Sequence, residues 1–172
     1  MFEFFWIISA ILVPIPLMHL WLHALISFWR KHAYFFYVFS FLLWIGSFFL
    51  FREVYYIFPY VIYFPSTISQ YIAVIFVIIG FILLFASFLS LGPKRFFVWA
   101  VLRQDSVSNI RVVRGPFKFF PHPAYTGYLF ISFAAFLLTG FFYMAFSFLF
   151  LFSFTPIVIF FENEELSKRL KG

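Results

Sequence analysis

The chain has 172 residues, of which 65% are hydrophobic and 10% are charged; it contains 34 phenylalanines and no cysteine. A soluble domain carries about 25% charged residues, so this chain has too little polar surface to face water on all sides. The lack of cysteine excludes disulfides, thiol nucleophiles and thiolate metal sites. Composition therefore predicts an integral membrane protein, and the net charge of +6 must be explained by where the basic residues lie.

Three long apolar stretches fill the first half of the chain. Each is long enough to cross a bilayer, which takes about 20 apolar residues: 4–29, 33–51 and 67–91. Pro14 and Pro16 should kink the first stretch. His19 and His23 lie four residues apart on one helix face, and we expect polar packing inside the bundle rather than a metal pair, because no further ligand follows at a suitable spacing.

A fourth uncharged stretch, residues 124–161, is too long for one crossing. A single helix of this length would measure about 57 Å, nearly twice the ~30 Å hydrocarbon core. Gly140 falls near its middle, so we predict a hairpin of two short helices that returns to its starting side. These stretches together predict an all-α membrane fold of about five transmembrane helices, of which the last two form a hairpin. We expect a single domain over residues 1–172. Its parts are a three-span region, 1–91, and a loop, hairpin and acidic tail, 92–172.

The basic residues are distributed unevenly over this topology. With the N-terminus outside, 11 of the 12 Lys and Arg residues lie on the inner side, and Arg52 alone lies outside. This is the positive-inside pattern, and it predicts a cytosolic C-terminus. Contact with anionic headgroups or an anionic cofactor explains the net charge without nucleic acid.

The residues able to carry chemistry gather on that inner side, in the polar segment 103–127 and the acidic cluster 162–165. His122 stands between two prolines, which keep its backbone extended. A hairpin would make His122 and Glu162 neighbours. No phosphate loop, Ser-His-Asp order, zinc-protease helix or acidic metal cluster is present. The residues alone therefore predict either a site for a mixed-charge ligand or simple helix caps at the membrane surface.

Several motifs follow one another in about the last 70 residues: Gly115-Pro116-Phe117, His122-Pro123-Ala124-Tyr125-Thr126-Gly127, an apolar hairpin, and an acidic segment at 162–170. This order resembles the isoprenylcysteine carboxyl methyltransferase and phospholipid methyltransferase superfamily. The resemblance implies an integral membrane enzyme that binds S-adenosylmethionine on the cytosolic side. Its substrate would be a membrane lipid or lipidated molecule, either a phospholipid amine or an isoprenylcysteine-type carboxylate.

The resemblance also implies which residues bind the cofactor. By position these are Gln104, Asn109, Ile110, Arg111, Val112, Phe117, His122, Pro123, Ala124 and Tyr125, with one glutamate for the amino acid moiety. Glu162 fits the family register, and Glu164 and Glu165 are the alternatives. From their charge alone, Arg103, Arg111 and Arg114 are candidates either for holding a substrate phosphate or carboxylate or for anchoring the protein at the headgroups.

Three departures from the family pattern bear on the site. Pro121 replaces the arginine before His-Pro, so an ionic contact is lost there. Val158, or Phe160 in the other register, stands where the isoprenylcysteine branch has an arginine for the substrate carboxylate, which argues against a prenylcysteine substrate. The sequence ends at Gly172, before the family's Tyr-x-x-Tyr, so we expect one wall of the pocket to be missing or otherwise supplied.

Methyl transfer needs mainly positioning, desolvation and a deprotonated nucleophile, so no catalytic base and no metal is assigned from the sequence. Two alternatives stay open at this level. One is an NADPH-dependent membrane reductase of the sterol or steroid type, which carries a similar His-Pro-x-Tyr segment. The other is an inactive membrane scaffold with the same fold.

Overall fold

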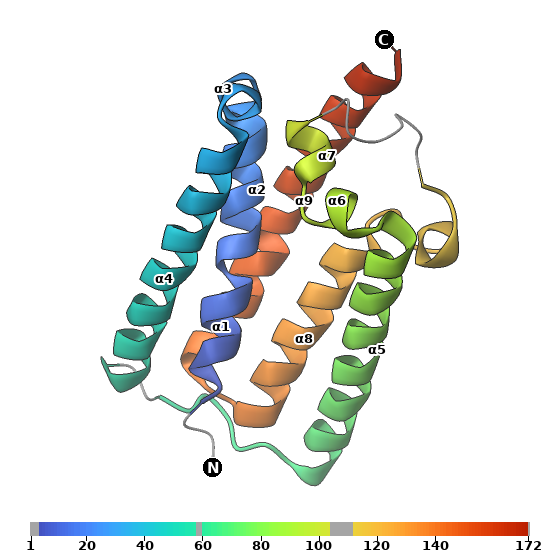
Figure 1. Cartoon of the computed structure of the whole chain (residues 1–172). Coiled ribbons are helices and arrows are strands. Elements are labelled where there is room, and N and C mark those ends of the chain that lie inside the picture. Colours follow the sequence, from blue (N-terminus) through green and yellow to red (C-terminus); the bar gives the residue numbers. More distant parts are fainter. Residues whose placement is uncertain (1–3, 58–59, 104–111, 172) are drawn as a thin grey trace.

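The computed structural model describes residues 4–57, 60–103 and 112–171, with backbone only at 169–171. These residues form helices joined by short loops, and the long helices run along one axis, with the start of α1 and the end of α9 at opposite ends of the molecule (Figure 1). Within the described residues, four stretches are long and apolar enough to cross a membrane: Trp6–Ala24, Ala33–Ile57, Thr67–Leu91 and Phe142–Lys168. A fifth apolar helix, Pro123–Thr139, is shorter. The predicted all-α membrane fold is confirmed.

The first predicted span is divided into α1 (Trp6–Leu12), α2 (Pro14–Ala24) and α3 (Ile26–Lys31). Pro14 is the first residue of α2, and its missing N–H interrupts the helical hydrogen bonds there. Val13 between the two helices keeps a helical backbone (φ −63°, ψ −36°), so α1 and α2 follow each other closely along the axis (Figure 1).

One boundary differs from that predicted. The second span was expected to end at Phe51, but α4 (Ala33–Ile57) continues past the charged pair Arg52-Glu53. Two charges do not stop a helix, because their side chains reach polar surroundings at the end of the span. After the third span come two short helices that were not predicted separately, α6 (Pro93–Phe96) and α7 (Trp99–Leu102). They follow directly on α5 (Thr67–Leu91).

The predicted hairpin is confirmed: α8 (Pro123–Thr139) and α9 (Phe142–Lys171) are joined at Gly140. Gly140 has φ +66°, and a Cβ there would collide with the carbonyl oxygen of Tyr63, so glycine is required at this turn. The loop before α5 closes over the turn, with Ile62 N donating to Gly140 O at 2.7 Å. The acidic tail continues α9, so its glutamates have fixed positions on that helix.

Helices α5 and α8 approach closely at a pair of glycines. A Cβ on Gly80 would lie 2.9 Å from the carbonyl oxygen of Gly127, and a Cβ on Gly127 would lie 2.8 Å from that of Gly80. Small residues at such a contact let two helix backbones pack directly against each other. This contact holds the first turns of α8 against α5, and His122 directly precedes α8.

The two ends of the molecule differ in charge. Helices α3, α6 and α7 and the last turns of α9 lie at one end (Figure 1), with the short 3-10 helix η2 (Gly115–Lys118) beside α5. Basic residues on these elements are Arg30, Lys31, Lys94, Arg95, Lys118 and Lys168. Arg52 lies near the C-terminal end of α4, at the opposite end of the molecule from α3 (Figure 1). Among the described residues, the basic side chains therefore gather where α8 begins and α9 ends.

Candidate functional site

His122 and Glu162 meet at this basic end because the hairpin returns α9 to the start of α8. His122 Nδ1 lies 3.6 Å from Glu162 Oε2, which confirms the predicted proximity. The non-helical backbone of His122 (φ −133°, ψ 67°) places its carbonyl to accept from Thr126 N and so begin α8. His122 Nε2 and Glu162 Oε2 are buried without a hydrogen-bond partner in the described part of the chain. Buried polar atoms are rarely left unsatisfied, so these two atoms indicate a ligand site.

Two small cavities, of about 130 Å³ and 100 Å³, adjoin this pair. We call them together the polar chamber. Six residues line both: Leu91, Arg95, Val101, Phe117, His122 and Glu162. The chamber therefore contains a carboxylate, an arginine and aromatic rings, and this combination suits a ligand that carries a positive and a negative charge.

The chamber includes most of the predicted cofactor residues that the structure describes. Val112 lines the first cavity, and Pro123, Ala124 and Tyr125 line the second. Arg103 and Arg114 are exposed and are not among the residues lining the chamber. The remaining predicted positions lie outside the described residues: Gln104, Asn109, Ile110 and Arg111.

The three candidate glutamates have different surroundings. Glu165 accepts from Arg30 Nη2 at 2.6 Å in a partly buried ion pair, and Glu164 accepts from Lys168 Nζ at 2.7 Å on the surface. Arg30 Nε also donates to Val101 O at 3.2 Å, so this one side chain joins α3, α7 and α9. Of the three glutamates, Glu162 is the one that lines the chamber.

Three basic residues of the chamber were not selected from the sequence. His19 and His23, on α2, line its second cavity, and Arg95, on α6, lines both cavities. The histidines do pack inside the bundle, but they face the chamber as well. Their i, i+4 spacing near the inner end of the first span was the available signal. Within the described residues, no group of three or more His, Cys, Asp or Glu side chains is arranged to hold a metal.

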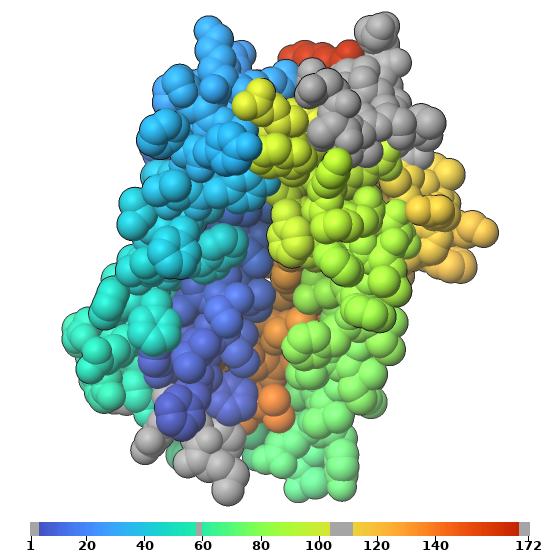
Figure 2. All heavy atoms as spheres, viewed as in Figure 1, coloured from blue at the N-terminus to red at the C-terminus, as the bar shows by residue number. Residues whose placement is uncertain are grey.

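A much larger cavity of about 830 Å³, the apolar groove, lies between α4 and α5. Its floor is formed by α1, α2 and α8, and Figure 2 shows α1 and α8 at the surface between α4 and α5, below α6 and α7. Several polar side chains on its wall are engaged within the protein: Trp44 Nε1 donates to Ile11 O at 3.0 Å, and Tyr37 and Ser40 also donate to backbone carbonyls. The groove therefore offers an almost entirely apolar surface, as an acyl chain requires.

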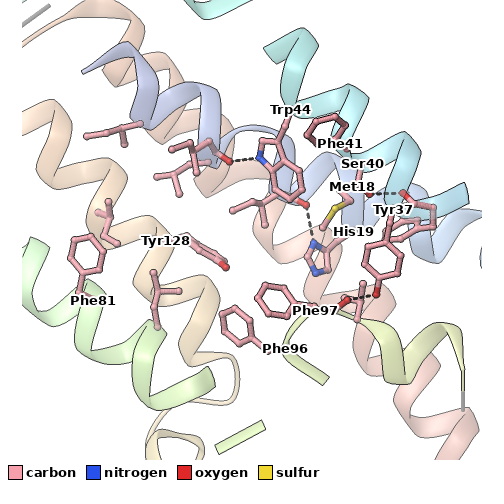
Figure 3. A pocket seen from close by; sticks show the side chains of 18 residues that line it. Met18, His19, Tyr37, Ser40, Phe41, Trp44, Phe81, Phe96, Phe97 and Tyr128 are labelled. Atoms are coloured by element: carbon pink, nitrogen blue, oxygen red, sulfur yellow. Dashed lines mark hydrogen bonds between the residues drawn. The ribbon is translucent and has the colours of Figure 1, made fainter. Parts of the chain in front are cut away.

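The groove and the polar chamber adjoin each other. Four residues line both the groove and the second cavity of the chamber: His19, Phe96, Val98 and Tyr128. In Figure 3 the rings of His19, Tyr128 and Phe96 lie around a common space. An apolar chain in the groove can thus present its polar end to a ligand in the chamber.

Residues 68–171 match the sequence model of the phospholipid methyltransferase family. The chain belongs to this family. The match confirms the resemblance, supports a membrane methyltransferase and does not favour the reductase. It covers α5 to α9 and leaves out α1 to α4, so His19 and His23 lie outside it. No curated protein and no solved structure matches the chain.

Proposed function

We propose that this protein transfers a methyl group from S-adenosylmethionine to the amine of a phospholipid headgroup at the cytosolic membrane surface. The observation that carries the proposal is a pair of buried atoms that lack a hydrogen-bond partner, His122 Nε2 and Glu162 Oε2, inside the segment that matches the family. A ligand with donor and acceptor groups would satisfy both atoms.

The residues of the chamber fit this cofactor. The Glu162 carboxylate would bind the amino group of its amino acid moiety, and Arg95 would bind its carboxylate. The rings of Phe117 and Tyr125 would pack on the adenine or on the positive sulfur. The bound cofactor supplies a methyl group that is already activated by the sulfonium. What remains is to hold the two reactants in line, to exclude water and to supply the acceptor with a free electron pair.

The acceptor is proposed to be an amine because this chain has no cation at the position where the isoprenylcysteine branch has an arginine for the substrate carboxylate. Val158, about one helical turn before Glu162, is fully buried and apolar. The acyl chains of the phospholipid would occupy the apolar groove, which opens between two helices that would face lipid. The headgroup would then lie at the level of Tyr128, where the groove meets the chamber.

The chamber is proposed to face the cytosol. The basic residues of the described chain gather at its end of the molecule, while Arg52 lies near the other end. This distribution is typical of cytosolic surfaces, and in that orientation the chamber would lie beside anionic headgroups and the soluble cofactor pool.

Titration of the purified protein in detergent with S-adenosylhomocysteine, by calorimetry, tests the cofactor site. We expect saturable binding that weakens at least tenfold in His122→Ala and Glu162→Gln. Glu164→Gln is the matched control, because Glu164 lies on the same helix but binds Lys168 at the surface. Absence of binding, or equal affinity in all variants, would refute the proposal. Protection by NADPH alone would indicate the reductase instead.

A second measurement tests the acceptor. Methyl-labelled S-adenosylmethionine is incubated with the protein in vesicles of phosphatidylethanolamine, or with a prenylcysteine in phosphatidylcholine vesicles. Label is expected in the lipid of the first sample only. Label in the prenylcysteine alone would refute the amine assignment and leave the methyltransferase intact.

A further inference from the structure

His19 occupies the boundary between the apolar groove and the polar chamber, and it lines both. Figure 3 shows its imidazole inside the groove, near Tyr128, Phe96 and Phe97. A lipid headgroup that passes from the groove towards a ligand in the chamber must therefore pass this ring. His19 comes from α2, outside the segment that matches the family, so the match assigns it no role.

The ring of His19 is fixed in orientation and in tautomer. Its Nδ1 lies 2.8 Å from the carbonyl oxygen of Ile15. A carbonyl can only accept a hydrogen bond, so Nδ1 carries the proton and, in the neutral imidazole, Nε2 holds a lone pair. The ring also packs edge-on against Tyr125 at 5.7 Å, and Tyr125 in turn lies 5.9 Å from the ring of His122. The three rings form a row from the groove to the chamber.

Three other polar groups on the groove wall already donate hydrogen bonds within the protein. Tyr37 donates to the Phe97 carbonyl at 2.7 Å, Ser40 to the Phe36 carbonyl, and Trp44 to the Ile11 carbonyl. An indole N–H cannot accept, and a serine or tyrosine hydroxyl is a much weaker base than imidazole. Among the described residues that line the groove, His19 therefore provides the basic nitrogen.

We propose that His19 Nε2 accepts the proton of the methyl-acceptor amine, an inference that rests on the proposed function. A phospholipid amine is an ammonium ion at neutral pH and has no lone pair with which to attack. The proton moves from the ammonium nitrogen to Nε2, and the electron pair of the N–H bond stays on nitrogen. That pair forms the bond to the transferred methyl carbon as the bond from carbon to sulfur breaks, with its electrons left on sulfur. The imidazolium then returns its proton to water through the chamber.

The first test uses His19→Gln, which retains hydrogen-bonding groups but has no basic nitrogen, with His32→Gln as the matched control. His32 is exposed and lies at the junction of α3 and α4, away from both cavities. At neutral pH we expect His19→Gln to lose ~10²–10⁴-fold in methyl transfer to phosphatidylethanolamine, the range for general base catalysis. Affinity for S-adenosylhomocysteine should be unchanged, and His32→Gln should match the unmodified protein.

The dependence of this rate on pH separates a proton acceptor from a structural residue. Without His19 the rate should rise about tenfold per pH unit until the lipid ammonium itself ionises. Added imidazole, or a lipid whose amine is less basic, should restore much of the rate. An unaltered rate and pH profile in His19→Gln would overturn the proposal. So would loss of S-adenosylhomocysteine binding, or a uniform loss of rate with no rescue, because either result assigns His19 to cofactor binding or structure.

A second test needs no turnover. In protein labelled with ¹⁵N-histidine, the Nε2 resonance of His19 reports whether that nitrogen holds a lone pair or a proton. We expect it to shift towards the protonated form when phosphatidylethanolamine is added in micelles, and not with phosphatidylcholine, whose nitrogen has no proton. Identical spectra with the two lipids would overturn the proposal. Failure of the proposed function appears separately, as a lack of methyl transfer by the unmodified protein.

Discussion

The contact between Gly80 and Gly127 predicts that adding one methyl group at position 127 will destabilise the protein. In Gly127→Ala the new Cβ would lie 2.8 Å from the Gly80 carbonyl oxygen and 3.0 Å from Leu84 Cγ. Ordinary contacts begin at 3.4 Å, so α8 must withdraw from α5 by about half an ångström. A helix carbonyl cannot rotate aside as a side chain can, because it is held by the helical hydrogen bonds.

The magnitude follows from a comparison with Gly46→Ala on α4, where an added Cβ meets nothing within 4 Å. Both changes gain about 1 kcal/mol of helix propensity, which cancels between the two variants. Overpacking at Gly127 costs roughly 1–3 kcal/mol, and the rigid partner favours the upper half of that range. We therefore expect Gly127→Ala to be less stable than Gly46→Ala by about 2–3 kcal/mol, or about 4–12 °C in Tm for a chain of this size.

Thermal unfolding in detergent, followed by intrinsic fluorescence, measures this difference. The withdrawal of α8 would also displace His122, so Gly127→Ala should bind S-adenosylhomocysteine more weakly while Gly46→Ala binds as the unmodified protein does. Equal Tm values for the two variants would show that α5 and α8 do not pack through these glycines, and the placement of the site would then be wrong.

Two further predictions concern the ion pair and the groove. Arg30→Gln removes the charged partner that Arg30 provides to the largely buried Glu165 carboxylate and should lower stability by about 1–3 kcal/mol, with part regained when Glu165→Gln is added. Additive Tm losses in this double-mutant cycle would contradict the pairing. Ser40→Phe should fill part of the apolar groove and raise the KM for phosphatidylethanolamine severalfold without changing affinity for S-adenosylhomocysteine. Leu42→Phe, at an exposed position on the same helix, is the control, and equal KM values in both variants would place the acyl chains elsewhere.

Much of the site could be predicted because the length and hydrophobicity of the segments that form it allow few topologies. A stretch of 38 uncharged residues is too long for a single membrane crossing, and this one has a glycine near its middle. The hairpin, and with it the meeting of His122 and Glu162, therefore followed from the length of the stretch and the position of its glycine. The choice among the glutamates did not follow. Glu162, Glu164 and Glu165 are close in sequence, but a helix turns about 100° per residue and points them at different partners.

The sequence by itself determined that the chain is a helical membrane protein, where its crossings lie, and that an imidazole and a carboxylate meet at its basic end. These features depend on length, hydrophobicity and charge, which act locally along the chain. Only the tertiary structure decided that His19 joins them and that a groove of about 830 Å³ adjoins the chamber. Both depend on how α2, α4, α5 and α8 pack against one another, and helix packing depends on the shapes of residues far apart in sequence.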